Sequence, residues 1–285
     1  MSGRIKWTED RIARLVAEGR GRGTGPDYRP WIQVADISSH GRSRRVWSPK
    51  TRRTHHLLSD VEYNLFLALE WARDVTDIRE QYPLDRIVTQ HVAHECGIPH
   101  PHYPSTNVCT VMTVDFMVTR VCGGRVFEEA FNAKRSEEAD DERSIAKLEI
   151  QRRAMALLDT PHHVVFHSDL PIQKIKNIDW IRDSLVKDGE LEPRPDFWSD
   201  MSARLANELA QQTQPGSRKL NLADYCATFD GRHGLQAGSG LRAARILMYD
   251  RTIQVDLSRP ELQTMPVASL VINQQSGQRF ATGVA

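Results

Sequence analysis

The segment VMTVDFMV, residues 111–118, has the pattern of a buried β-strand with an aspartate in its middle. Side chains alternate between the two faces of a strand, so positions 112, 114, 116 and 118 form one fully apolar face. Asp115 lies on the other face, with Thr113 and Met117. An ionised carboxylate that is buried without a partner costs several kcal/mol. Asp115 therefore requires a metal ion, a cationic side chain, hydrogen-bond donors or an opening to water.

Composition places the chain among ordinary globular proteins. Its 285 residues are 40% apolar and 26% charged, enough for one large domain or two smaller ones with a real core. No apolar run approaches the length of a membrane span, and the N-terminus lacks the apolar core of a signal peptide. The four cysteines form no CxxC pair. We therefore expect a reduced, cytoplasmic protein with no membrane association.

Positive charge is concentrated at the N-terminus. Residues 1–56, here called the basic arm, carry thirteen Lys and Arg against five acidic residues, whereas the whole chain has a net charge of +1. Such an arm suits a polyanion, above all nucleic acid, although a solvated extension would show the same charge. Within it, EGRGRGTGPDYRPW (18–31) contains neither a GxGxxG nor a Walker motif. We expect a flexible connector able to lie along a phosphate backbone.

The next part of the chain predicts a compact α/β domain over residues 57–169. Its expected elements are a helix (57–75), a short extended piece (77–84), a loop rich in His and Pro, two strands (111–118 and 126–134) joined by a Gly-Gly turn, a helix (144–159) and a final strand (162–169). Residues 170–285 predict a smaller winged-helix-like domain, with three short helices followed by a strand–turn–strand at 243–257.

The second strand of the hairpin, VFEEAFNAK, places Asn132 and Lys134 on one face. An aspartate on the neighbouring strand, followed by a lysine two residues after a polar carbonyl-bearing side chain, resembles the D…(D/E)xK motif of metal-dependent nucleases. Oxygen ligands hold Mg²⁺, the ion activates a water molecule, and the lysine stabilises developing negative charge. This spacing is common by chance, and a buried salt bridge or charges at the strand ends would explain it equally.

Glu62 follows Ser59 in an S-x-x-E pattern at the start of the first long helix, which is typical of a capping box. Capping and metal binding conflict only if the Glu62 side chain folds back onto Ser59.

The order of several motifs resembles the TnsA family, the endonuclease subunits of the two-protein transposases of Tn-seven-like transposons, some of them CRISPR-associated. The matching segments are EGRGRGTGPDYRPW, GRSRRVWSPKTRRTHHLLSDVEYNLFLALEW, DIREQYPL, TVDF, FNAK and KLEIQRR. They cover nearly all of the first 170 residues. The resemblance implies a restriction-endonuclease-like core of the PD-(D/E)xK type.

The same resemblance assigns the catalytic glutamate, aspartate and lysine of the family to Glu62, Asp115 and Lys134. Glu62, Asp115 and Asn132 would be the metal ligands, for two Mg²⁺ ions that Mn²⁺ could replace. Asn132 stands where the family has glutamine or glutamate, and its shorter, neutral side chain weakens the second metal position. The implied partners are double-stranded DNA at transposon ends, a DDE transposase (TnsB) and an AAA+ ATPase (TnsC), the last through the C-terminal domain.

Two alternatives stay open. A stand-alone restriction-type nuclease would cleave duplex DNA without a partner, and a DNA-binding assembly factor with a decayed site would ignore Mg²⁺. The histidine-rich segment QHVAHECGIPHPH (90–102) lacks the spacing of a strong zinc site, so we favour a solvated loop there. His162, His163 and His167 are expected to cover the ends of their strand.

Overall fold

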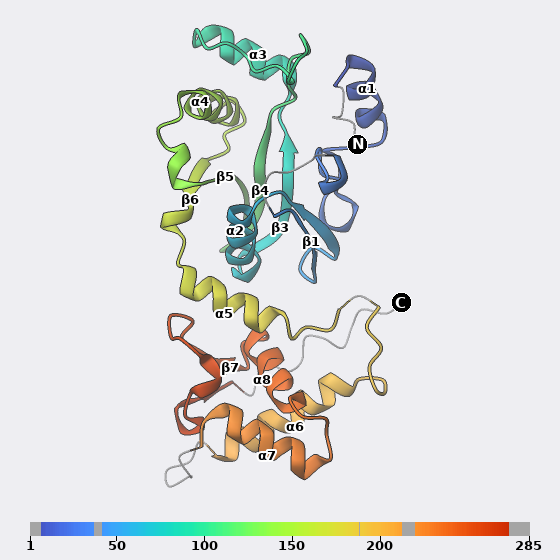
Figure 1. The fold of residues 1–285 in the computed structure, drawn as a ribbon, viewed down its shortest axis with the longest axis vertical. Helices are drawn as coiled ribbons and strands as arrows, with labels where there is room; N and C mark the ends of the chain where they lie inside the picture. The colour runs from blue at the N-terminus through green and yellow to red at the C-terminus, as the bar shows by residue number, and fades with distance from the viewer. Residues whose placement is uncertain (1–6, 37–41, 188, 213–219, 274–285) are drawn as a thin grey trace. The chain divides into compact units, whose positions relative to one another are not determined.

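The computed structural model describes residues 7–36, 42–187, 189–212 and 220–273. The chain divides into two compact units, Met1–Leu170 and Pro171–Ala285. The boundary falls next to residue 169, where the sequence predicts the end of the α/β domain. Figure 1 shows the helices and strands of both units.

A central four-stranded sheet organises the first unit (Figure 1). Its order is β3 (Val75–Pro83), β4 (Thr113–Cys122), β5 (Arg125–Lys134) and β6 (His162–Phe166). The first three strands are antiparallel, and β6 runs parallel to β5. The predicted hairpin is confirmed, because β4 and β5 pair directly across a turn in which Gly123 and Gly124 both have positive φ angles. Glycine adopts that backbone conformation without strain.

Three helices of this unit pack near the sheet: α2 (Asp60–Trp71), α3 (Arg86–Glu95) and α4 (Glu142–Ala156). Helix α2 contacts β2, β3 and β5, whereas α3 and α4 contact each other. One apolar cluster joins α3 and α4 to the sheet, with Val92, Ala93, Ile150, Ala154, Met155, Met117 and Ala130 among its members. This packing fixes α4 beside the part of the sheet that carries Asp115.

The expectation of a flexible connector at residues 18–31 is wrong. The segment follows α1 (Glu9–Ala17) and is anchored to the outer strand of the sheet. Tyr28 is buried, and its hydroxyl donates a hydrogen bond of 3.0 Å to the Glu80 carbonyl. The Trp31 amide donates to the Gln81 carbonyl at 3.2 Å. Helix α1 is held as well, because Ile12 and Leu15 share an apolar cluster with Trp31, Tyr103 and Val111.

A buried ion cluster joins the end of the basic arm to β3. Strand β1 (Arg44–Ser48) pairs with β2 (Arg53–Leu57), and two β2 side chains contact Glu80, which has no exposed surface. Arg53 donates to both Glu80 carboxylate oxygens, and His55 Nδ1 lies 2.8 Å from Oε2. Burial alone would raise the pKa of Glu80, but His55 and Arg53 outweigh it and hold that pKa far below its ordinary value. Arg53 therefore belongs to the core rather than to a DNA-binding surface.

The described part of the second unit contains four α-helices: α5 (Ile172–Arg182), α6 (Phe197–Gln212), α7 (Leu222–His233) and α8 (Ser239–Tyr249). The predicted strand–turn–strand at 243–257 is wrong, because its first half lies in α8. Ala243, Ala244, Leu247 and Met248 are buried at helical spacing. Only β7 (Ile253–Gln254) is extended there, and it pairs with β8 (Val271–Ile272).

Candidate active site

Asp115, Asn132 and Lys134 come together on one face of the β4–β5 hairpin. The Ala133 amide on β5 donates a hydrogen bond of 2.8 Å to Asp115 Oδ2. A cavity of about 200 Å³ opens beside these three side chains, and Thr113 also borders it. Its other wall is the N-terminal part of α4 and the turn before it, with Glu138, Asp141, Ser144, Lys147, Leu148 and Gln151. The apolar packing of α4 against the sheet positions that wall.

Glu62 folds back onto Ser59 at the start of α2, the arrangement in which capping competes with metal binding. Only half of a capping box forms, because the Glu62 carboxylate accepts from the Leu58 amide rather than from the Ser59 amide. Ser59 is the N-cap and accepts a hydrogen bond from the Glu62 amide at 3.1 Å. The Leu58 amide donates to Glu62 Oε2 at 3.0 Å, and Ser59 Oγ donates to Oε1 at the same distance. Gln81 Nε2 adds a second donor to Oε2 at 3.3 Å. Because Oε1 receives one donor and a carboxylate oxygen has two lone pairs, Oε1 keeps a free acceptor site.

A hydrogen-bonded chain connects Glu62 to the strand of Asp115. Gln81 donates to Glu62 and accepts from Thr113 Oγ1 at 3.2 Å. Burial, followed by the charge of Asp115, raises the pKa of Glu62 to about 8. Burial also raises the pKa of Asp115, against the opposing effect of Lys134. The Glu62 carboxylate is buried and that of Asp115 is half-buried at the cavity. A divalent cation would stabilise the charged form of both, so this donor set fits a hard metal ion.

Lys134 lies at the end of β5, with its Nζ 3.6 Å from the Glu138 carboxylate. The Glu138 side chain is partly exposed, at 42% of its full surface. The ion pair is therefore open to solvent on one side and weak. Lys134 faces the cavity and remains available to a phosphate oxygen or to a water molecule.

His162 is a part of this site that sequence reasoning missed. Its Nε2 atom lies 2.6 Å from Asn132 Oδ1, and burial lowers the pKa of His162 to about 4. The parallel pairing of β6 with β5 sets Ala130 opposite His162, which brings the imidazole onto the face of Asn132. The pairing of residues so distant in the chain left no local signal in the sequence.

The other histidines do not form a metal site within the described residues, where no group of three or more His, Cys, Asp and Glu side chains is arranged to hold an ion. The histidine-rich segment is not simply a solvated loop, because His91 and His94 lie on α3. His100 Nε2 lies 3.1 Å from Thr89 Oγ1 and so ties the following loop to this helix.

Among the described residues, no helix is long and apolar enough to span a bilayer.

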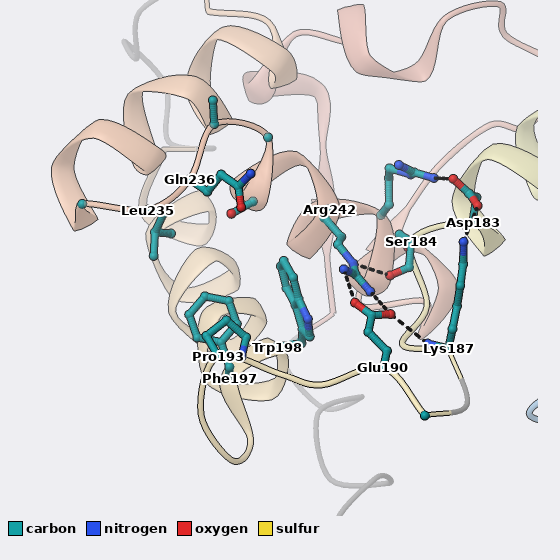
Figure 2. A pocket seen from close by; sticks show the side chains of 16 residues that line it. Asp183, Ser184, Lys187, Glu190, Pro193, Phe197, Trp198, Leu235, Gln236 and Arg242 are labelled. Carbon is teal, nitrogen blue, oxygen red and sulfur yellow. Dashed lines mark hydrogen bonds and ion pairs between the residues drawn. The ribbon is translucent and has the colours of Figure 1, made fainter.

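A larger cavity, about 900 Å³, lies within the second unit (Figure 2). Its prominent charged group is Arg242, which forms two hydrogen bonds with Glu190 and stacks on Trp198. Lys187 is paired with Asp183 at 3.5 Å. Asp183 and Glu190, the two carboxylates that line this cavity, are therefore each paired with a cationic side chain.

Comparisons with known proteins identify the family of the chain. Residues 72–167 match the family described as TnsA-like endonuclease N terminal, and residues 169–257 match TnsA endonuclease C terminal. The chain is 34% identical over 276 residues to Transposon Tn7 transposition protein TnsA of Escherichia coli, covering 94% of this chain and 93% of that protein. The chain belongs to the TnsA family of transposition endonucleases.

Proposed function

We propose that this chain is a Mg²⁺-dependent DNA endonuclease that hydrolyses the 5′ strand at each transposon end during cut-and-paste transposition. The observation that supports this most directly is that Asp115 and Lys134 line one small cavity. Glu62 is connected to Thr113 at the edge of this cavity through Gln81. On this proposal the first unit is a restriction-endonuclease-like domain. The four helices and the short β7–β8 pair of the second unit form the winged-helix-like domain.

Each side chain has a distinct role in the proposed reaction. Glu62 and Asp115 would hold the cation, with Asn132 as a further oxygen ligand, and Mn²⁺ could substitute for Mg²⁺. The bound ion would supply charge stabilisation and a more acidic water. Lys134 would orient the attacking water or stabilise the charge that develops on the phosphate oxygens.

The partners are part of the same proposal. The family membership supports a DDE transposase of the TnsB type, which would cut and join the other strand, and an AAA+ regulator of the TnsC type, contacted through the second unit. Two alternatives remain: a stand-alone nuclease that needs no partner, and a DNA-binding assembly factor without catalytic activity. The closed network around Glu62, Gln81 and Thr113 favours a maintained site over a decayed one.

Replacing Lys134 tests the catalytic proposal. We expect Lys134→Met to lower the rate of 5′-strand cleavage about 100- to 1000-fold, because it removes a charge that stabilises the transition state. Cleavage of labelled end DNA is measured in the presence of the partner transposase, with Mg²⁺, Mn²⁺ or EDTA. Lys174→Met, at an exposed position on α5, is the matched control. Equal rates in the Lys134 and Lys174 variants, or cleavage in EDTA, would refute the proposal.

The basic arm needs a different test from simple truncation, because removing α1 would open an apolar cluster. Arg42, Arg45 and Arg52 are exposed and lie on or beside the β1–β2 hairpin. If all three contact phosphates, changing them together to Gln should reduce the slope of log affinity against log salt by about 2.7 units. Affinity for duplex DNA is measured at several salt concentrations. An unchanged slope would remove the hairpin from the DNA-binding surface.

A further inference from the structure

The side chain of Asn132 is enclosed between two partners. It is 3% exposed, so water cannot freely replace either of them. On one side, His162 Nε2 lies 2.6 Å from its Oδ1 atom. On the other lies Asp115, which lines the same cavity and whose raised pKa is opposed by the Asn132 amide. The amide thus lies between an imidazole and the carboxylate proposed to hold a cation.

The chemistry of the two partners decides which end of the amide faces which partner. An ionised carboxylate only accepts hydrogen bonds, so Asn132 must turn its Nδ2 group toward Asp115. Its Oδ1 atom then faces His162, where it can only accept. The neutral imidazole must therefore carry its hydrogen on Nε2 in this state. The charge on Asp115 therefore fixes both the orientation of the Asn132 amide and the tautomer of His162.

A cation beside Asp115 reverses this preference. An NH₂ group directed at a cation is repelled, whereas the carbonyl end of the same amide is a ligand. Turning the amide over exchanges two groups of nearly equal size, so no space needs to open around the buried side chain. Nδ2 would then face His162, and the imidazole would have to accept at Nε2 with its hydrogen moved to Nδ1.

We propose that Asn132 and His162 form a two-position switch, in which Asn132 turns over when a divalent cation binds and His162 changes tautomer with it. His162 is thus a positioning residue that acts through Asn132. The inference rests on the proposed metal site and concerns how that site is assembled. It also explains how an asparagine can serve two opposite purposes: a donor that stabilises Asp115 without the ion and a ligand with it.

Nitrogen NMR of histidine-labelled protein tests the switch without any cleavage. In the absence of divalent cations, His162 should carry its hydrogen on Nε2. Saturating Mg²⁺, or Ca²⁺ in a parallel sample, should move the hydrogen to Nδ1. His163 is the internal control, because it faces Glu129 at 3.4 Å and stacks on Phe131, away from Asn132. If the cation shifts the Ala133 amide signal next to Asp115 while His162 keeps its Nε2 hydrogen, the switch is refuted.

The same titration distinguishes failure of the switch from failure of the metal proposal. If neither the Ala133 signal nor thermal stability responds to the cation, the metal site itself is wrong and the switch falls with it. In Asn132→Asp, the side chain can only accept, so His162 should keep its Nε2 hydrogen with and without the cation. A tautomer change in that variant would show that Asn132 does not drive it.

Substitutions at His162 provide a second readout, the cation concentration that gives half of the maximal thermal stabilisation. His162→Leu should raise that concentration about 10-fold or more, the usual effect of losing a group that orients a metal ligand. His162→Gln should change it less than about 3-fold, because its own amide can turn to donate or accept. If His162→Leu and His162→Gln change that cation concentration equally, His162 acts only through packing. If the Leu variant does not fold, the Gln variant and the NMR titration still decide the question.

Discussion

Asp115→Ala protein should assemble with its partner transposase on transposon ends and yet leave the 5′ strands uncut. The proposed site places Asp115 and Lys134 at one small cavity, to which Glu62 is linked through Gln81 and Thr113. The chain would therefore have one hydrolytic centre and would cut one strand per end. Removing the central ligand eliminates charge stabilisation worth several kcal/mol in the transition state. Since each 1.4 kcal/mol is a factor of ten, we expect a loss of at least about 1000-fold in rate.

The fold should survive this substitution. Asp115 borders a cavity and accepts only one backbone hydrogen bond, from Ala133, among the described contacts. Its removal also relieves the charge that raises the pKa of Glu62. That pKa should move down toward its ordinary value, and the Glu62 carboxyl should ionise at lower pH. The thermal unfolding midpoint should stay equal to, or exceed, that of the unchanged protein.

A denaturing gel that resolves both strands at each end provides the measurement. The partner's strand should still be cut and joined, so that the products remain linked to the donor DNA through the 5′ strands. Glu129→Ala is the matched control, because this carboxylate lies on the same β5 strand but pairs with Arg120 and His163. Loss of both cuts in intact assemblies would contradict the proposal that each of the two proteins cuts one strand. Undiminished 5′ cutting would exclude Asp115 from the site.

Arg53→Met should destabilise the first unit by about 3–5 kcal/mol, the usual cost of leaving a buried charge without its partner. Glu80 has no exposed surface, and Arg53 donates to both of its carboxylate oxygens. The second variant is Arg53→Met combined with Glu80→Gln. It should recover much of the loss, because no carboxylate then remains buried. Urea unfolding followed by near-UV circular dichroism gives the free energies.

The pH dependence of this effect has a definite sign. The pKa of Glu80 is depressed in the folded protein, so its contribution to stability is present above the ordinary value near 4.5 and is lost as pH falls below it. The difference in unfolding free energy between the Arg53→Met variant and the unchanged protein should therefore become smaller at acidic pH. Arg152→Met is the control, because Arg152 forms an exposed pair with Glu149 and should change stability little. An equal loss in both variants would refute the assignment of a buried, stabilising cluster.

The sequence was informative where the signal is local. Alternation along residues 111–118 predicted a strand that presents Asp115 on its less apolar face, and the Gly-Gly turn predicted the hairpin with β5. The S-x-x-E pattern predicted the cap at Ser59, which forms. Each of these features depends on residues a few positions apart.

The incorrect predictions concern segments whose conformation depends on contacts with residues far away in the sequence. The Gly- and Arg-rich segment at 18–31 looked solvated because its anchors, Glu80 and Gln81, are about fifty residues further along the chain. Residues 243–249 contain side chains that suit a strand or a helix, and burial of Ala243, Ala244 and Leu247 on one side decided for the helix. His162 reaches Asn132 only because β6 joins the sheet in parallel. Such pairings cannot be inferred from local periodicity.

The β4–β5 hairpin has a consequence for how this chain can vary or be engineered. Asp115 and Lys134 depend on the pairing of the two strands, since shifting one strand by a single residue would turn its side chains to the other face. Extra residues between Gly123 and Gly124 would extend into open space, because a Cβ at either glycine meets no neighbouring atom within 4 Å. The ladder from Phe116–Phe131 to Cys122–Arg125 would then have to hold the register of the two strands. This turn is thus a place where a fluorescent label or a tethered domain could be inserted while both reactive groups keep their positions.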